Sequence, residues 1–400
     1  MRAAVIGAGP AGSEAAARLA RGGVETVLFD PDLDREKPCG GGVPWRGLAE
    51  FDGLRAADLP AREVRHVLFE APSGATASVT LPSPLRVFSR RTLDSRWVAR
   101  AEQAGASVRA EKVVGVVRDG EMRVRTASGR DEGFDLVVGA DGVTSRTRAA
   151  LSRRFDEADL SQAVGYYVPG GTDDVARLAF TTGLNGYLWS FPRTDHLAVG
   201  ACAPLAEGSA AALWREVDAY VGRIDPSLDV ATLPRYGALI PALSPASLRA
   251  NRIAGPGWLL VGDAAGSVDP LTREGIAPGL RSAALAADVV LAGHPERYPR
   301  AWEQELQPEL LWASERSGRF FAPDLTERLV RYLDRSKAIR AVMADLVLGR
   351  QSYRTLKRRL LRAGIPFLRV THRRLTRDRA ELTADLASRL PRTGPGRRAG

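Results

Sequence analysis

The sequence predicts an α/β protein in which a parallel sheet, an antiparallel sheet and a helical C-terminal region follow one another. Two short apolar runs, residues 3–6 and 24–29, flank an Ala-rich helical segment and so form a βαβ unit. Residues 163–202 contain four short segments of strand composition, which indicates a change to an antiparallel sheet. From Pro295 onward the pattern is that of helices with scattered arginines.

The first apolar run leads directly into a turn with the spacing G-x-G-x-x-G, made by Gly7, Ala8, Gly9, Pro10, Ala11 and Gly12. Gly7 permits the tight turn, Gly9 lets a pyrophosphate approach the backbone, and Gly12 lets the following helix pack on the strand. Free N–H groups at the helix start can hold the pyrophosphate, and Asp30 can accept hydrogen bonds from an adenosine ribose. Strand, helix and acid are all in place, so the sequence predicts a Rossmann-like dinucleotide-binding domain.

Composition limits the classes of protein to which the chain can belong. Of its 400 residues, 44% are hydrophobic and 26% are charged, as in an ordinary globular protein. The net charge of +10 does not predict a nucleic-acid partner, because residues 350–400 alone hold 15 Lys or Arg and three Asp or Glu. Cys39 and Cys202 are too few for a disulfide framework or a metal cluster. No apolar run reaches the ~18 residues of a membrane span, and a strand from Ala3 leaves no room for a signal peptide, so we expect a cytoplasmic protein.

A second glycine-rich stretch, residues 37–42 (KPCGGG), cannot form a regular helix or strand. Its three glycines can lie flat against a planar group, and Cys39 is a candidate for chemistry; the alternative is a turn with an incidental thiol. Residues 62–88 then predict a hairpin around a Pro-Ser-Gly turn. A helix is predicted from Arg90 to Ala104.

Two further buried strands are followed by turns that contain Gly and Asp. Residues 134–138 are expected to form one strand that runs into Asp141, near Arg146 and Arg148; this turn is either ordinary or faces an anionic cofactor. Residues 257–261 form the other strand, and a helix follows at about residues 277–291. Ligands bind at the carboxyl ends of parallel strands, where this order places Gly262, Asp263, Pro270, Gly275 and Ile276.

Three aromatic residues share one face of a strand in the predicted antiparallel sheet. Tyr187, Trp189 and Phe191 alternate along the chain, so their side chains point the same way. Such a stripe forms either part of a core or the wall of a pocket, and the residues themselves leave both interpretations open.

Together these motifs resemble the FAD-dependent oxidoreductases with the p-hydroxybenzoate-hydroxylase-like fold, and most of all the geranylgeranyl reductase family, over about residues 1–300. The general flavoprotein motifs are the G-x-G-x-x-G turn with Asp30, the R-x-x-L-D segment from Arg90, and the three later turns. The Cys-Gly-Gly-Gly loop and the Tyr-x-Trp-x-Phe-Pro strand match the reductases specifically, and their joint presence favours a pocket wall for the aromatic stripe. Arg273 departs from the family, which often has glycine or another small residue there.

The resemblance implies non-covalently bound FAD and a set of cofactor-binding residues, namely Gly7, Gly9, Pro10, Ala11, Gly12, Asp30, Cys39, Gly40, Gly41, Arg90, Asp141, Gly262, Asp263, Pro270, Gly275 and Ile276. It implies catalytic positions at Cys39, Tyr187 and Trp189, and reduction of carbon–carbon double bonds in an isoprenoid or related apolar substrate. There is no second G-x-G-x-x-G unit, so the reductant is either transiently bound NAD(P)H or a separate electron-donor protein.

Three alternatives share the general flavin motifs. The first is an FAD-dependent monooxygenase or tailoring oxidoreductase that acts on an aromatic or polyketide-like molecule in secondary metabolism. The second is a halogenase. Resemblance to that class implies a lysine about 70 to 80 residues into the chain, and this chain has no lysine between Lys37 and Lys112, so a halogenase is disfavoured. The third is a non-catalytic FAD protein that uses its basic tail as a membrane-binding surface.

The predicted domains are discontinuous in sequence. The FAD-binding domain comprises residues 1–60, 85–160 and 250–292, and the substrate-binding sheet comprises residues 61–84 and 161–249. A helical region at residues 293–390 and a disordered tail at residues 391–400 follow. The basic segment from residue 350 interleaves Arg and Lys with Leu, which predicts either a helix at an anionic membrane surface, on the inner face, or a solvated helix packed on the domain.

Overall fold

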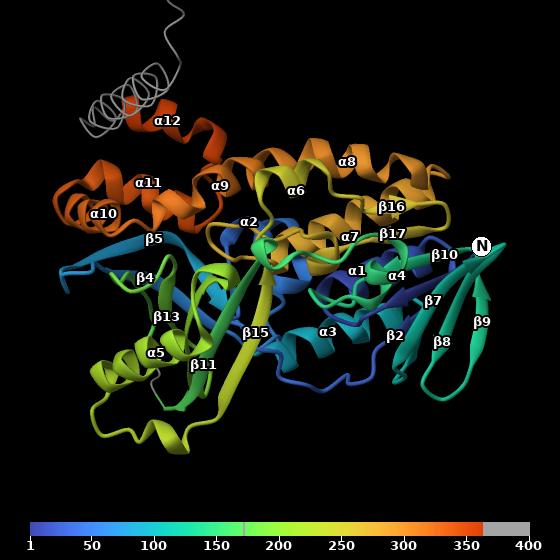
Figure 1. Cartoon of the computed structure of the whole chain (residues 1–400), viewed down its shortest axis with the longest axis horizontal. Coiled ribbons are helices and arrows are strands. Elements are labelled where there is room, and N and C mark those ends of the chain that lie inside the picture. Colours follow the sequence, from blue (N-terminus) through green and yellow to red (C-terminus); the bar gives the residue numbers. More distant parts are fainter. Residues whose placement is uncertain (171–172, 363–400) are drawn as a thin grey trace, which may run out of the picture. The chain divides into compact units, whose positions relative to one another are not determined.

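The structure is a computed structural model, and it describes residues 1–170 and 173–362 (Figure 1). Met1–Arg354 form one compact unit, and a second unit begins at Thr355. The predicted disordered tail and the predicted helices beyond residue 362 lie outside the described residues. Within the described residues the strands form sheets of six, eight and three strands.

The six-stranded sheet has the order β16-β17-β10-β1-β2-β6. Its strands are β1 (Arg2–Ile6), β2 (Glu25–Phe29), β6 (Ser107–Arg109), β10 (Leu136–Gly139), β16 (Ala254–Gly255) and β17 (Trp258–Leu260). All neighbours are parallel except β16 and β17. The central strands are almost fully buried because helices pack against the sheet, which explains their continuous apolar sequences.

Helix α1 (Pro10–Arg21) lies between α3 (Arg90–Gln103) and α7 (Ile276–Leu291) (Figure 1). It begins with proline at its first position and is rich in alanine, which favours a helix and permits close packing. It ends at Arg21 with Gly22 as its C-cap, and the next residue, Gly23, has φ +84° in the left-handed region. The predicted βαβ unit and its glycine stop are confirmed.

The eight-stranded sheet has the order β15-β11-β14-β13-β12-β4-β5-β3. Its strands are β3 (Gly42–Val43), β4 (Arg62–Glu70), β5 (Thr76–Val87), β11 (Leu160–Pro169), β12 (Val175–Ala179), β13 (Tyr187–Pro192), β14 (His196–Pro204) and β15 (Arg235–Pro241). The prediction of an antiparallel sheet needs one correction, because β12 and β4 pair in parallel. The β4–β5 hairpin joins the edge of a sheet formed more than 70 residues later, and its direction there is set by packing. Helix α5 (Ala210–Ile224) covers the opposite face from the aromatic stripe.

Residues 134–138 were expected to form one strand, and this prediction is wrong. The chain leaves β9 (Asp131–Phe134) at Asp135 and enters β10 in a different sheet. β9 belongs to a three-stranded antiparallel sheet with β7 (Val113–Asp119) and β8 (Glu121–Thr126). The Asp135 carboxylate accepts the backbone N–H of Arg2 at 2.6 Å, so its polar side chain marks the crossing between the sheets.

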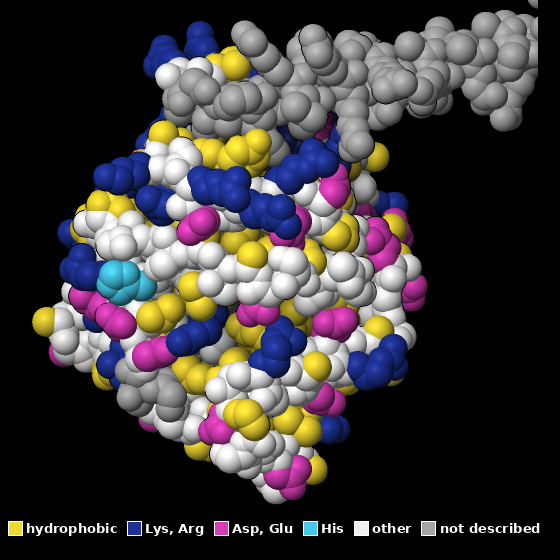
Figure 2. All heavy atoms as spheres, turned by 90° about the vertical axis from the view of Figure 1, so that its left-hand side faces the viewer, with side chains coloured by type: hydrophobic (Ala, Val, Ile, Leu, Met, Phe, Trp, Pro, Cys, Tyr) yellow, Lys and Arg dark blue, Asp and Glu magenta, His cyan; other side chains and the backbone are white. Residues whose placement is uncertain are grey.

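Short helices connect the sheets, and longer helices follow α7. The short helices are α2 (Trp45–Glu50), α4 (Arg146–Leu151) and α6 (Pro245–Arg249). The later helices are α8 (Tyr298–Glu305), α9 (Gln307–Phe320), α10 (Pro323–Arg335), α11 (Lys337–Val347) and α12 (Tyr353–Arg362). α10 and α11 lie along β5 (Figure 1), and on this side of the molecule Lys and Arg form a band with Asp and Glu beside them (Figure 2). Over residues 1–170 and 173–362, every helix is too short or too polar to cross a membrane.

The two large sheets bear on the predicted domain division. All strands of the six-stranded sheet come from the three segments assigned to the FAD-binding domain. Most strands of the eight-stranded sheet come from the other two segments, but β3 does not, and β5 continues through the predicted boundary at residue 84. Since Met1–Arg354 pack as one unit, the division into two domains stays a prediction.

Candidate active site

The G-x-G-x-x-G turn contains glycines of two kinds. Gly7 has φ +102°, and a Cβ there would lie 2.3 Å from the Ala140 carbonyl oxygen; at Gly12 it would lie 1.8 Å from the Gly7 carbonyl oxygen. Gly9 differs, because its φ is −68° and no atom of the described residues lies within 4 Å of an added Cβ. Gly7 and Gly12 are therefore required by the fold. Gly9 leaves space at the start of α1, in the place where a pyrophosphate would bind, so this turn fits FAD.

Asp30 is buried, with 3% of its surface exposed, behind this turn. Its Oδ2 accepts the backbone N–H of Ala8 at 2.8 Å, which holds the turn in place. The same carboxylate forms an ion pair with Arg35, in which Nη1 lies 2.5 Å from Oδ1 and Nη2 lies 3.1 Å from Oδ2. An adenosine ribose at Asp30 would therefore share the carboxylate with Arg35, a residue that the sequence analysis missed.

The Cys-Gly-Gly-Gly loop is anchored by a buried ion pair between Glu36 and Arg193. Arg193 is fully buried, and it also donates to the Cys39 carbonyl at 2.6 Å. Glu36 accepts the first backbone N–H groups of α3, from Arg90 at 2.9 Å and Arg91 at 3.1 Å. Burial alone would raise the pKa of Glu36, but Arg193 and these hydrogen bonds outweigh it and lower that pKa. The loop is thus fixed to α3 and to the turn after β13 by two residues that the motifs did not identify.

Arg90 lies beneath this loop and is 4% exposed. It forms a two-fold ion pair with Asp94, in which both N···O distances are 2.9 Å. Burial lowers the pKa of Arg90, but Asp94 and the neighbouring Cys39 raise it above the usual value. The Cys39 sulfur accepts the Gly41 N–H at 3.3 Å. Two predicted site residues, Arg90 and Cys39, are thus brought together.

Two glycines of the loop, Gly40 and Gly42, pack on the aromatic stripe, whereas Gly41 faces the Phe88 backbone. A Cβ at Gly40 would lie 2.9 Å from the Phe191 ring and 3.6 Å from Trp189 Nε1. The Trp189 Nε1–H and the Tyr167 hydroxyl are both buried, and neither has a hydrogen-bond partner with good geometry within the residues that the structure describes. Buried polar atoms normally have partners, so the presence of such groups at this face favours a pocket wall over an inert core.

The third group of predicted residues meets the first two at the start of α7. Gly262 has φ +61°, and a Cβ there would lie 2.9 Å from the Ala11 side chain. Asp263 forms an ion pair with Lys37 at 3.3 Å, which links it to the Cys-Gly-Gly-Gly loop. Gly275 is the N-cap of α7, and a Cβ there would lie 3.3 Å from Asp263 Oδ1. Pro270 is buried in the intervening loop.

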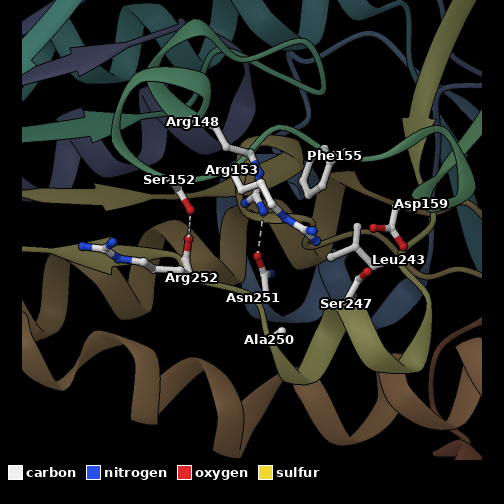
Figure 3. A pocket seen from close by; sticks show the side chains of 10 residues that line it. All are labelled: Arg148, Ser152, Arg153, Phe155, Asp159, Leu243, Ser247, Ala250, Asn251 and Arg252. Atoms are coloured by element: carbon white, nitrogen blue, oxygen red, sulfur yellow. Dashed lines mark hydrogen bonds between the residues drawn. The ribbon is translucent and has the colours of Figure 1, made fainter.

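Asp141 has a structural role in this fold. Its carboxylate accepts the Thr147 backbone N–H at 3.0 Å, the Thr147 hydroxyl at 3.1 Å and the Ser145 hydroxyl, which caps α4. Arg148 donates to the Ala264 carbonyl at 3.1 Å and to Asn251 at 3.0 Å, and it lines a cavity of about 300 Å³ beside α4 and α6 (Figure 3). Burial is the main cause that lowers the pKa of Arg148 to about 10. The turn at Asp141 could be an ordinary turn or could face an anionic cofactor, and these contacts favour an ordinary turn that caps α4.

Two titratable groups near the start of α7 have raised pKa values because they are buried. Burial raises the pKa of Tyr187 well above its usual value, and the Tyr187 hydroxyl donates to the Thr272 carbonyl at 2.5 Å. Burial also raises the pKa of Glu274 to about 8, while its carboxyl accepts the Ala277 N–H at 2.8 Å. In both groups burial thus favours the protonated form.

A parallel sheet with this turn, and an aromatic sheet face against a glycine loop, define an FAD-dependent oxidoreductase. The family model for glucose inhibited division protein A matches residues 2–43. A menaquinone reductase of Mycolicibacterium smegmatis is 34% identical over 328 residues, which cover 76% of this chain and 79% of that protein. A chloroplastic geranylgeranyl diphosphate reductase of Oryza sativa is 31% identical, over 73% of this chain and 67% of that protein. The chain belongs to the geranylgeranyl reductase family of FAD-dependent oxidoreductases.

The fold of the family is also found among solved structures. The crystal structure of a geranylgeranyl bacteriochlorophyll reductase-like protein from Thermoplasma acidophilum matches with a TM-score of 0.75 and 21% identity. The match covers 90% of this chain and 98% of that chain. The predicted fold class, with its Rossmann-like part, second sheet and helical C-terminal region, is therefore confirmed.

Proposed function

We propose that this protein reduces carbon–carbon double bonds in an isoprenoid or related apolar substrate. The observation that carries the proposal is the packing of Gly40 against Phe191 and Trp189, in a loop that the Lys37–Asp263 ion pair links to the start of α7. The relatives named geranylgeranyl diphosphate reductase and menaquinone reductase support it, since both names denote reductases. The unpartnered Trp189 and Tyr167 polar atoms support a ligand at this face.

FAD, when bound, supplies hydride to one carbon of the double bond. The chain's own part is to hold the cofactor and the substrate. The free N–H groups at Gly9–Gly12 would hold the pyrophosphate, Asp263 would lie at the ribityl or pyrophosphate part, and the start of α7 would present its N–H groups to the flavin ring. Either NAD(P)H or a separate electron-donor protein would restore the reduced cofactor.

The second carbon needs a proton, and the contacts favour Cys39 over Tyr187 as its source. The Tyr187 proton is engaged by the Thr272 carbonyl, and burial raises the pKa of Tyr187, so that its loss is disfavoured. The Cys39 sulfur lies beside Arg90 and accepts the Gly41 N–H, and among the described residues no hydrogen bond engages its own proton. Trp189 would then serve as the wall that places the double bond.

Anaerobic turnover tests the proposed reaction. With chemically reduced flavin and no O2, the enzyme is expected to convert geranylgeraniol to a product that gains two hydrogens per double bond, as measured by mass spectrometry. Hydride transfer from flavin needs no oxygen, so admitting O2 should only lower the yield. A product that forms only with O2 and carries an oxygen atom from it would favour the monooxygenase alternative.

Membrane contact is a separate proposal for the basic C-terminal segment. α12 places Leu356 and Leu360 one helical turn apart and carries Arg354, Lys357, Arg358, Arg359 and Arg362. Each basic residue near an anionic lipid surface contributes about 1 kcal/mol, so such a helix can bind in the interface. The apolar residues Ile365, Phe367 and Leu368, which belong to the same hypothesis, lie outside the described residues.

Vesicle co-sedimentation measures this contact. Binding to anionic vesicles is expected, with loss at high salt and on truncation before Gln351, because the attraction is electrostatic. Neutral vesicles are the control. If the full chain binds neither kind of vesicle, the segment is a solvated helical face.

A further inference from the structure

The loop at residues 269–275 leads into α7 and is organised by the carboxylate of Asp269. Its Oδ1 accepts the backbone N–H groups of Leu271 at 2.7 Å and Thr272 at 3.2 Å. Gly275, the last residue of the loop, is the N-cap of α7. The position of the start of α7, where the flavin ring would bind, therefore depends on how this loop is held.

The backbone of the loop is closed by two hydrogen bonds and contains one disfavoured conformation. The Asp269 N–H donates to the Glu274 carbonyl, and the Arg273 N–H donates to the Asp269 carbonyl, both at 2.9 Å. Arg273 has φ +60°, and across residues 1–170 and 173–362 it is the one non-glycine residue with a positive φ. Such a conformation persists only where the surrounding structure enforces it, so the loop needs anchors from other parts of the chain.

Two tyrosine hydroxyls anchor the loop from outside. The Tyr187 hydroxyl, from the aromatic stripe on β13, donates to the Thr272 carbonyl at 2.5 Å. The Tyr353 hydroxyl, from the start of α12, donates to Asp269 Oδ2 at 2.8 Å. Asp269 thus receives the loop's own N–H groups on one oxygen and a hydroxyl from the C-terminal region on the other.

Tyr353 is itself held in place by α9. Its ring stacks on Trp312, with the ring centroids 4.9 Å apart and the planes inclined by 5°. Its backbone N–H donates to one carboxylate oxygen of Glu309 at 2.8 Å, and the hydroxyl of Ser352 donates to the other. The Tyr353 hydroxyl is therefore presented to Asp269 by a fixed side chain, which lies beyond the part of the sequence that carries the flavin motifs.

We propose that Tyr353 is a positioning residue of the candidate active site, which acts through Asp269 to hold the loop that sets the start of α7. This inference rests on the proposed function, because it assigns a role within that same site. Hydrogen bonds to a charged oxygen are stronger than those between neutral groups, so the hydroxyl is a substantial part of what holds the carboxylate. The helical C-terminal region in this way completes a site whose motifs all lie earlier in the chain.

The protonation state of Asp269 gives this contact a signature in pH. Burial raises the pKa of Asp269, and that rise is opposed by hydrogen bonds and a positive charge from Leu271, Tyr353, Thr272 and Arg273. Further titratable groups that interact with Asp269 or with Tyr353 are Tyr187, Glu274 and Glu309. Without the Tyr353 hydroxyl the pKa of Asp269 rises further, so the carboxylate gains a proton, and releases the loop N–H groups, at a higher pH.

Tyr353→Phe tests the contact, because it removes the hydroxyl and keeps the ring on Trp312. Hydrogen exchange of the FAD-loaded enzyme, measured by mass spectrometry, is expected to show roughly 10-fold lower protection of the peptide 269–277, the effect of one hydrogen bond to a charged group. As the pH is lowered, the absorbance of the bound flavin should change at a higher pH than in the wild type.

Tyr166→Phe is the matched control. The Tyr166 hydroxyl also donates to a carboxylate, that of Asp218 at 2.7 Å, but on the sheet face that α5 covers, opposite the aromatic stripe. Its loss has a similar cost in stability and should change neither the protection of the peptide 269–277 nor the pH at which the flavin absorbance changes. The comparison separates a role at the site from a general loss of stability.

Asp269→Asn tests whether Tyr353 acts through Asp269. In this background Tyr353→Phe should have little further effect on exchange, because the charged acceptor is already absent. The inference is overturned if Tyr353→Phe changes the protection no more than Tyr166→Phe does, leaves the pH of the flavin transition unchanged, or keeps its full effect beside Asp269→Asn. If the FAD-loaded enzyme reduces no alkene, the proposed function fails, while exchange and the flavin titration still decide the role of Tyr353.

Discussion

Gly9→Val is expected to abolish FAD binding and to leave the fold intact. The backbone of Gly9, with φ −68° and ψ 176°, suits any residue, and an added Cβ meets no atom of the described residues within 4 Å. The valine would therefore fill only the space in front of α1, where the pyrophosphate must approach. The lost contacts to its charged oxygens should weaken binding roughly 100-fold or more. Flavin absorbance of the purified protein and titration of the apoprotein with FAD measure the effect.

The design needs two comparisons. Gly222→Val is the matched control, because Gly222 lies in α5, far along the chain from the turn, and an added Cβ there also meets open space. It should keep full FAD occupancy. Gly12→Val should instead prevent folding, because its Cβ would lie 1.8 Å from the Gly7 carbonyl oxygen. Full FAD occupancy in Gly9→Val, with circular dichroism like that of the wild type, would contradict the cofactor assignment at this turn.

Glu36→Gln is expected to lower the free energy of unfolding by about 3–5 kcal/mol, the usual cost of removing one partner of a buried ion pair. Arg193 is fully buried and has Glu36 as its ion-pair partner, so the glutamine would leave its charge uncompensated. The glutamine also weakens the hydrogen bonds to the first N–H groups of α3. Chemical denaturation with saturating FAD measures the loss.

Glu50→Gln is the control for the loss of stability expected in Glu36→Gln. Glu50 pairs with Arg281 at 2.7 Å near the surface, where an ion pair contributes at most about 1 kcal/mol. The double variant Glu36→Gln/Arg193→Gln should recover part of the loss, because it removes the uncompensated charge. A loss from Glu36→Gln no larger than that from Glu50→Gln would show that the buried pair does not anchor the loop.

Sequence patterns predicted the elements well where one local signal decided them. The βαβ unit from Arg2 to Phe29 was correct because burial on both faces produces apolar strands and the Gly22–Gly23 stop is local. The continuous strand at residues 134–138 was wrong because its apolar residues serve two different sheets, and hydropathy does not record which sheet a residue enters. The parallel pairing of β12 with β4 was missed for a similar reason, since strand direction depends on partners far along the chain.

The sequence by itself determined the flavin motifs and the family, because each of these depends on residues at fixed short spacings. Only the tertiary structure decided how those motifs are held. The Glu36–Arg193 ion pair joins residues 157 positions apart. Arg35 donates to the Asp30 carboxylate, which the motif predicts to bind a ribose. Likewise, Tyr187 gives its hydrogen bond to Thr272, 85 residues away, and Arg273 comes to lie beside Cys202. Such contacts form when distant segments pack together, and no local spacing encodes them.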